Sequence, residues 1–115
     1  MHLSGNIMID RRYLERAGNV VVEDESGLAE LRAWAATVHA QGAVLWGQLS
    51  HPGRQCPRLV NLHPLAPSPI QLDLVGNFGK PRAMTEAQIL DVVARFARSA
   101  ALIQSAGFDG VQVHS

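Results

Sequence analysis

Apolar residues recur at helical spacing in two stretches of the chain. In residues 26–41 the spacing is i, i+3, i+7 and i+10, which predicts a helix with one apolar face: Leu28, Leu31, Ala35 and Val38. We expect Ser26 to be its N-cap and Gly42 to stop it. A second helix is predicted to begin at Thr85, which has capping-box spacing to Gln88, and to end at Gly107. Its apolar face consists of Ile89, Val92, Val93, Phe96, Ala100 and Ile103.

Each predicted helix is followed by a short run that reads as a strand. These runs are AVLWGQL at 43–49 and GVQVH at 110–114. Both are mostly apolar on both faces, which is typical of parallel strands covered by helices. Two helix–strand repeats indicate an α/β fold, and HLSG at 2–5 is consistent with the end of an earlier strand.

The segment at 50–84 lacks this periodicity and holds all six prolines of the chain. Loops of this length are uncommon inside compact domains and are often functional. Within it, IQLDLV at 70–75 alternates apolar and polar residues, which predicts one arm of a small hairpin.

Polar side chains gather toward the ends of the two predicted strands. Side chains alternate along a strand, so Gln48 shares a face with Trp46, and His114 shares a face with Gln112. Functional sites of open α/β sheets and of (β/α) barrels lie at the carboxyl ends of the strands. Gln48 and His114 are therefore candidates to meet above one pocket, although both side chains could equally serve only to satisfy nearby backbone groups.

Composition narrows the class of protein. The chain has 115 residues, 47% of them hydrophobic and 17% charged, which suits one globular domain at residues 1–115. Ten basic and ten acidic residues cancel, so charge gives no argument for a nucleic-acid partner. No run approaches the roughly 18 apolar residues of a membrane span. The N-terminus lacks a signal layout and Cys56 is the only cysteine, so we expect a cytoplasmic protein.

Several blocks of sequence resemble one enzyme family in order along the chain. They are LSGNIMIDRRYLERAGNVVV, WGQLSHPGRQ, LHPLAPS, FGKPRAMTEAQI and RFARSAALIQSAGFDGVQVH. Together they resemble the Old Yellow Enzyme family of NADH:flavin oxidoreductases. The resemblance implies a (β/α)8 TIM barrel that binds FMN. Since a complete barrel needs about 250 residues, it implies a partial barrel here, from the end of the second strand to the end of the fourth.

The resemblance also implies roles for three residues. Gln48 would hydrogen-bond the pyrimidine end of FMN, and Gly5, as the small residue closing the second strand, would lie against the flavin ring. His114 would be the first member of a pair that holds the oxygen of a small-molecule electron acceptor. NAD(P)H would be the electron donor and an activated alkene a typical acceptor. The second member of that pair and the family's tyrosine proton donor fall outside these residues.

Two other interpretations remain open. The chain can be a catalytically inert barrel fragment, whose unpaired strand edges at Leu3 and Val113 favour self-association into a homo-oligomer. A TIM-barrel metal-dependent hydrolase is the weaker alternative, because the histidines lack metal-ligand spacing.

A few further residues carry predictions of their own. His51 and Arg54 are expected to shape a turn beside Pro52 and Gly53, or else to cap the pocket. Cys56 is expected to be a small loop hydrophobe and Trp46 a barrel-core residue. A charged cluster is expected to be solvated: Arg11, Arg12, Glu15 and Arg16.

Overall fold

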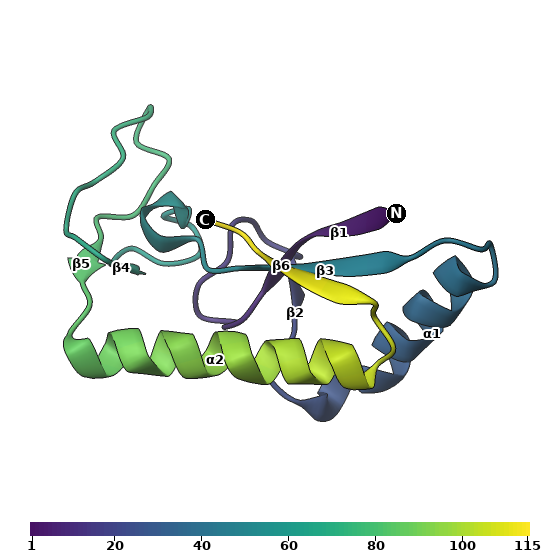
Figure 1. The fold of residues 1–115 in the computed structure, drawn as a ribbon. Helices are drawn as coiled ribbons and strands as arrows, with labels where there is room; N and C mark the ends of the chain where they lie inside the picture. Colours follow the sequence, from purple (N-terminus) through teal and green to yellow (C-terminus); the bar gives the residue numbers. More distant parts are fainter.

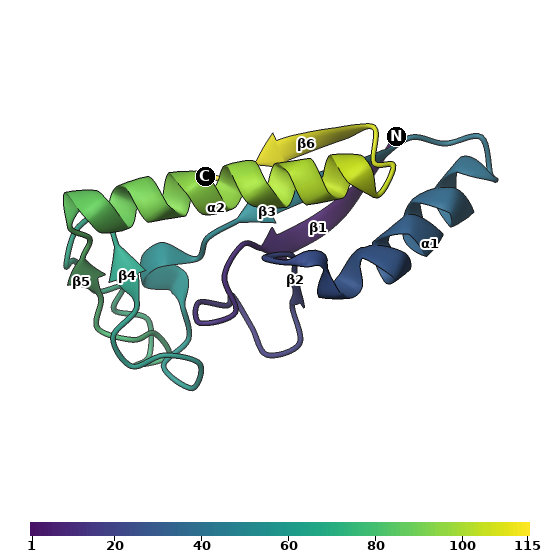
Figure 2. The same cartoon turned by 90° about the horizontal axis from the view of Figure 1, so that it is seen from below.

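The computed structural model describes residues 1–115, which form a parallel sheet with both helices on one face (Figures 1 and 2). The strands are β1 (His2–Met8), β2 (Val20–Val21), β3 (Leu45–Ser50), β4 (Leu65–Ala66), β5 (Arg82–Ala83) and β6 (Gly110–Val113). The helices are α1 (Leu28–His39) and α2 (Glu86–Ser105), with two short 3-10 turns, η1 (Glu25–Gly27) and η2 (Gly53–Gln55). The main sheet has the order β2-β1-β3-β6 with all neighbours parallel, so β1-α1-β3-α2-β6 forms two βαβ units. The predicted α/β fold is confirmed.

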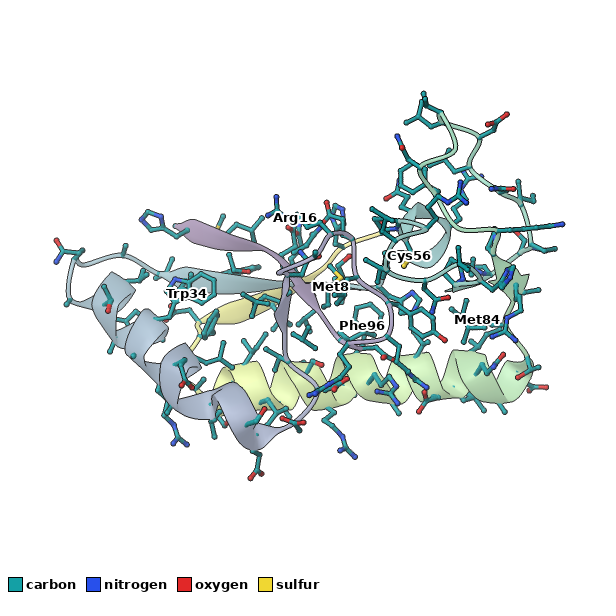
Figure 3. All side chains as sticks on the ribbon, turned by 180° about the vertical axis from the view of Figure 1, so that it is seen from behind. Met8, Arg16, Trp34, Cys56, Met84 and Phe96 are labelled. Carbon is teal, nitrogen blue, oxygen red and sulfur yellow. The ribbon has the colours of Figure 1, made fainter.

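The core lies between the sheet and the two helices. Leu45 and Leu49 of β3 are buried on the helix side, whereas Trp46 on the other face is 38% exposed. The buried cluster also takes residues from both helices: Leu31, Ala35 and Ile103. Trp34 and Phe96 pack against it from α1 and α2 (Figure 3). The predicted apolar face of α1 is confirmed, but that of α2 is correct only in part, because Ile89 and Val93 are exposed. Trp46 is not enclosed by this chain.

Gly47 sets how closely α2 approaches β3. A Cβ atom built on Gly47 would lie 2.9 Å from the Cδ1 atom of Ile103, which is closer than side chains normally pack. The absence of a side chain at this position therefore lets Ile103 lie against the strand backbone.

The boundaries of α2 agree with the sequence prediction. Thr85 and Gln88 form the predicted capping box, and the helix ends two residues before Gly107. The start of α1 does not agree. The turn η1 precedes it, and Asp24 is the N-cap of that turn, accepting a hydrogen bond from the Ser26 N–H, while the N-cap of α1 itself is Gly27, which has no side chain to form a cap. The prediction of Ser26 as N-cap was wrong because Asp24 caps a 3-10 turn that includes Ser26, and α1 begins only after that turn.

The segment between β3 and α2 folds as a separate lobe at the carboxyl ends of the strands (Figure 1). Its only ladder pairs β4 with β5 in parallel, Leu65 with Arg82 and Ala66 with Ala83. Residues 70–75 form no strand, so the hairpin prediction was wrong. Ile70 and Leu74 remain exposed there, because no partner strand or second layer lies against them.

A hydrogen-bonded carboxylate joins three elements at the opposite end of the sheet. The Asp109 carboxylate accepts hydrogen bonds from the His39 Nε2 atom and from the Leu45 N–H, each at 2.8 Å. The hydrogen bond from His39 lowers the pKa of Asp109. This contact links the end of α1 to the starts of β3 and β6, away from the carboxyl ends of the strands.

Candidate functional site

The predicted pair, Gln48 and His114, comes together on the open face of the sheet. Gln48 lies opposite Gln112 in the parallel register of β3 and β6. Its side-chain Nε2 atom donates to the Gln112 Oε1 atom at 2.6 Å and lies 3.4 Å from the His114 Nδ1 atom. Gln48 and His114 therefore lie in contact, as predicted, and Gln112 joins them.

The contacts of Gln48 determine what the group offers to a ligand. Both hydrogens of its Nε2 amide have acceptors, Gln112 and His114, while its Oε1 atom has no partner in the chain. Because an amide NH2 group can only donate, this contact uses His114 Nδ1 as an acceptor, and the Nε2 atom has no partner in the chain. The site thus presents one unpaired acceptor and one unpaired donor.

Gly5 lies in the middle of β1, three residues before the end of that strand, and does not close it as expected. It has φ +74°, and the β1–β3 register shifts between Leu3 and Asn6, which marks a β-bulge. The bulge removes a ladder partner from the Gln48 backbone N–H, which donates instead to the Ser4 hydroxyl at 2.9 Å. Gly5 therefore acts on the position of Gln48 through the backbone, and no atom lies within 4 Å of the place where its Cβ would be.

Asn6 is a site residue that sequence reasoning missed. After the bulge it aligns with Gln48, so Asn6, Gln48 and Gln112 occupy one row across three neighbouring strands. Its Nδ2 atom donates to Glu15 at 2.6 Å, and its Oδ1 atom is buried without a partner. A simple alternation count through residues 2–8 hides this row, because it takes no account of the extra residue in the bulge.

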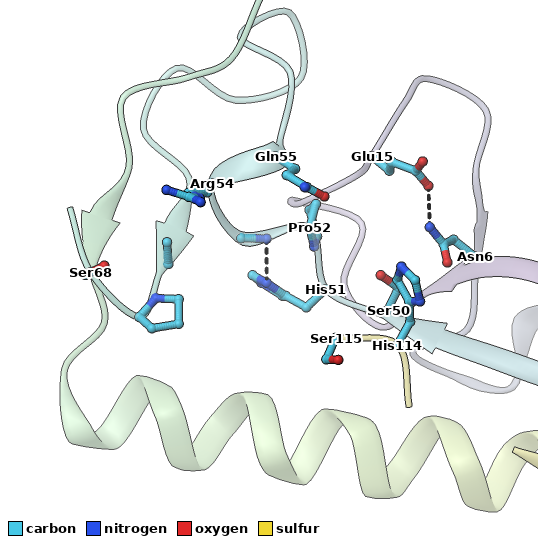
Figure 4. Close-up of a pocket in the computed structure, with 13 residues that line it drawn as sticks. Asn6, Glu15, Ser50, His51, Pro52, Arg54, Gln55, Ser68, His114 and Ser115 are labelled. Atoms are coloured by element: carbon cyan, nitrogen blue, oxygen red, sulfur yellow. Dashed lines mark hydrogen bonds between the residues drawn. The ribbon is translucent and has the colours of Figure 1, made fainter. Parts of the chain in front are cut away.

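A hollow of about 410 Å³ lies beyond the strand ends, between the sheet and the lobe (Figure 4). His114 belongs to its lining, so the hollow adjoins the polar row on the sheet. The other principal polar residues around it are Asn6, Glu15, Ser50, His51, Arg54, Gln55 and Ser68. The site therefore combines an open sheet face with a polar recess at the carboxyl ends of the strands.

His51 shapes the turn at the wall of this hollow. Its Nδ1 atom accepts from the Gly53 N–H at 3.2 Å, and its ring packs against Tyr13 with centroids 5.2 Å apart. Burial lowers the pKa of His51, so the ring is neutral at pH 7 and carries its proton on Nε2. This geometry matches the predicted role in the turn, whereas Arg54 lines the hollow itself.

The predicted charged cluster is exposed as expected, because Arg11, Arg12, Glu15 and Arg16 all lie at the surface, but two of its arginines also pair with carboxylates. Asp10 is 2% exposed, and its carboxylate lies 2.6 Å from the Arg12 guanidinium and 3.4 Å from that of Arg95 on α2. Arg11 pairs with Glu23. These carboxylates follow β1 and β2, and Arg95 connects both of them to α2, at 3.4 Å from Asp10 and 3.9 Å from Glu23.

Cys56 lies inside the lobe and is completely buried (Figure 3). Burial raises the pKa of its thiol. Its position agrees with the prediction of a small loop hydrophobe.

The fold and the polar strand ends define a segment of an α/β barrel. Comparison with known proteins shows the family to which this segment belongs. The chain belongs to the NADH:flavin oxidoreductase / NADH oxidase family, whose model matches residues 7–115. It is 35% identical, over 98% of its length, to the NADH-dependent flavin oxidoreductase nadA of Aspergillus parasiticus, of which it covers 27%.

Solved structures of the same type agree. The chain superimposes over 97% of its length on the old yellow enzyme homologue from Zymomonas mobilis, with TM-score 0.84 and 25% identity. For morphinone reductase the TM-score is 0.85 and the identity 26%, again over 97% of the chain. In both cases it covers 34% of the solved chain, so it spans about a third of these barrels. The expected partial TIM barrel is confirmed. No helix in the chain is long and apolar enough to span a membrane.

Proposed function

We propose that this chain forms part of the FMN site of an Old Yellow Enzyme-type oxidoreductase. In that enzyme, hydride passes from NAD(P)H through FMN to an activated alkene or a similar small-molecule acceptor. The observation that carries the proposal is the contact between Gln48 and His114 on the open sheet face, 3.4 Å apart. Membership of the flavin oxidoreductase family supports it and favours it over a metal-dependent hydrolase.

The residues present fit the polar edge of a flavin. The unpaired Gln48 Oε1 atom can accept from a ring N–H, and the unpartnered Asn6 Oδ1 atom lies in the same row. The missing side chain at Gly5 leaves the adjoining surface clear for a flat ring. FMN, when bound, supplies the hydride chemistry, and this chain supplies orientation and hydrogen bonds.

His114 is proposed to act on the acceptor. Its free Nε2–H can donate to a carbonyl or nitro oxygen while Gln48 holds the other ring nitrogen. Such a donor withdraws electron density from the acceptor, and the β-carbon of an enone becomes more electrophilic. The neighbouring hollow provides space for a small molecule beside His114.

A second proposal concerns the chain by itself, which we expect to be catalytically inert. It spans about a third of its solved relatives, and the outer edge of β6 has no partner strand. A site open on one side does not exclude water or hold both reactants in place. The chain mixed with FMN and an enone should therefore oxidise NADH no faster than free FMN does. A rate well above that of free FMN would contradict this second proposal.

The FMN proposal can be tested through the two tryptophans. Trp46 lies on the Gln48 face, whereas Trp34 packs against Phe108 on the helix side of the sheet. FMN bound at the proposed site should quench Trp46 strongly. Titration of the Trp34→Phe variant should therefore show saturable quenching, and the Trp46→Phe variant should show little.

A graft provides the second arm of this test. Residues 1–115 replace the matching third of the Zymomonas homologue, and retained FMN is measured by absorbance after desalting. A yellow graft that loses flavin on Gln48→Leu, but not on the distant change Gln41→Leu, supports the proposal. Equal quenching in both tryptophan variants, together with a folded but colourless graft, would refute it.

A further inference from the structure

We propose that Gln112 is a positioning residue that fixes which way round the Gln48 side-chain amide faces its ligand. The inference deepens the proposed function, on which it rests. It gives a role to Gln112, for which neither the strand-end pattern nor the family resemblance predicted one.

The backbone register of β3 and β6 brings the Gln48 and Gln112 side chains together. Gln48 and Gln112 are directly paired on adjacent parallel strands, and their side chains lie on the same open face. The Gln48 Nε2 atom lies 2.6 Å from Gln112 Oε1, a short distance for an amide–amide hydrogen bond. The contact to His114 is longer, at 3.4 Å, so Gln112 holds the amide more firmly.

A primary amide has a donor end and an acceptor end of nearly the same shape. Rotation by half a turn would exchange them and reverse what the site offers to a ligand. With its NH2 group held by Gln112, Gln48 directs Oε1 outward and selects a ligand edge that carries an N–H. An imide edge, such as that of the flavin pyrimidine ring, has this character.

The identity of residue 112 determines how strict the selection is. A glutamine accepts from Gln48 in the observed arrangement, and it could donate only if both amides rotated together, which would give up the contact between Gln48 Nε2 and His114 Nδ1. A carboxylate at 112 could only accept and would hold Gln48 in one orientation. A leucine at position 112 forms no side-chain hydrogen bond, so it would hold the Gln48 amide in neither orientation. Glu and Leu at position 112 are therefore the informative substitutions.

The first experiment follows the Gln48 side-chain amide by NMR in the 15N-labelled 115-residue chain. In the wild type, the proton donated to Gln112 should be shifted downfield from its partner and exchange slowly with water. Gln112→Glu should keep or increase that separation, and Gln112→Leu should abolish it. Gln104→Leu, the same chemical change at an exposed position on α2, should have no effect.

The second experiment measures FMN affinity by fluorescence titration of the same proteins. Loss of one net hydrogen bond of about 1 kcal/mol predicts a roughly fivefold weaker Kd for Gln112→Leu. Gln112→Glu should change Kd less than about twofold, a rescue that a merely structural role would not give. Circular dichroism shows that each variant is folded.

The outcomes separate the two proposals. A Gln48 amide spectrum that is the same in the wild type and in Gln112→Leu overturns the positioning role. So does an equal loss of FMN affinity in the Glu and Leu variants. The expected spectra in a wild-type chain that does not bind FMN would leave the amide orientation established and count against the proposed function.

Discussion

At the scale of single residues, the site depends on groups whose environment differs from that of an ordinary surface side chain. Gly5 has a positive φ that few other residues tolerate. Asp10 is a buried carboxylate surrounded by guanidinium groups. Neither residue touches the Gln48 amide; Gly5 lies within β1, beside Gln48, and Asp10 lies in the loop that follows β1.

Substitution of Gly5 by alanine should lower the free energy of unfolding by about 1–2 kcal/mol, because a Cβ atom strains a left-handed backbone. Open space around this position means that the loss comes from the backbone and not from a clash. Urea unfolding measures it. The control is Gly27→Ala, which has an ordinary φ of −101° and equally open surroundings, and which should cost less than Gly5→Ala, since at the N-cap of α1 it changes only the capping preference. Equal effects of the two substitutions would argue against the bulge.

Asp10 should make stability depend on pH. Its burial acts to raise the pKa, but hydrogen bonds from Arg12 and the charge of Arg95 lower it overall. Since the folded pKa lies below the unfolded value of about 3.9, the stabilisation is present above that pH and is lost as pH falls through the folded pKa.

Asp10→Asn should therefore lower the free energy of unfolding at pH 7 by about 1–3 kcal/mol, the usual contribution of hydrogen bonds to a charged group. The difference from the wild type should shrink in acid, which urea titrations at pH 7 and pH 3 can show. Asp91→Asn removes an exposed pair with Arg95 and should cost less than about 0.5 kcal/mol. A deficit in Asp10→Asn that is constant across this range would contradict the assignment.

At the scale of elements, the fit of α2 against β3 places β6, and with it His114. Phe108 and Ile103 are buried beneath β3, and Gly110 begins β6 directly after this contact. A shift of α2 would therefore move the start of β6 relative to Gln48. The packing at Gly47 controls this distance.

Gly47→Ala should destabilise the chain by about 1–3 kcal/mol, the usual cost of overpacking a filled core. The new methyl would meet the Ile103 Cδ1 atom at 2.9 Å, and Ile103→Val removes that atom. The double variant should therefore lose less stability than the sum of the two single variants, which chemical denaturation of all four proteins can measure. Strict additivity would mean that the two residues do not contact each other as described.

At the scale of the whole molecule, the chain has one covered and one open sheet face. Trp46 and Leu3 are exposed on strands that the helices cover only from the other side. At the outer edge, Val113 on β6 is 63% exposed and its strand has no further partner. An unpaired apolar edge of this kind favours association with another strand.

We therefore expect the isolated chain to self-associate as its concentration rises, as sedimentation velocity can show. Val113→Lys should reduce this association, because a charge on an edge strand opposes pairing. Leu59→Lys is the matched control, since Leu59 is 96% exposed in the lobe, away from the edge. Equal loss of association in both variants would point to net charge rather than to the β6 edge.

The local sequence was sufficient to predict both helices and the strands β3 and β6, with the face on which the side chains of those two strands lie. Apolar spacing and the Thr85–Gln88 cap determine α2 from neighbouring residues alone. Alternation placed Gln48 and His114 at strand ends, and their meeting follows because adjacent parallel strands end at one edge.

Tertiary structure decided what depends on residues far apart in the chain. The bulge at Gly5, the row of Asn6, Gln48 and Gln112, and the carboxylate of Asp109 between two elements all arise from strand register and helix packing. Residues 70–75 alternate as a strand would but form none, because a strand requires a partner that local sequence cannot supply. Local periodicity specifies elements, whereas contacts between distant segments determine which polar atoms remain free to bind a ligand.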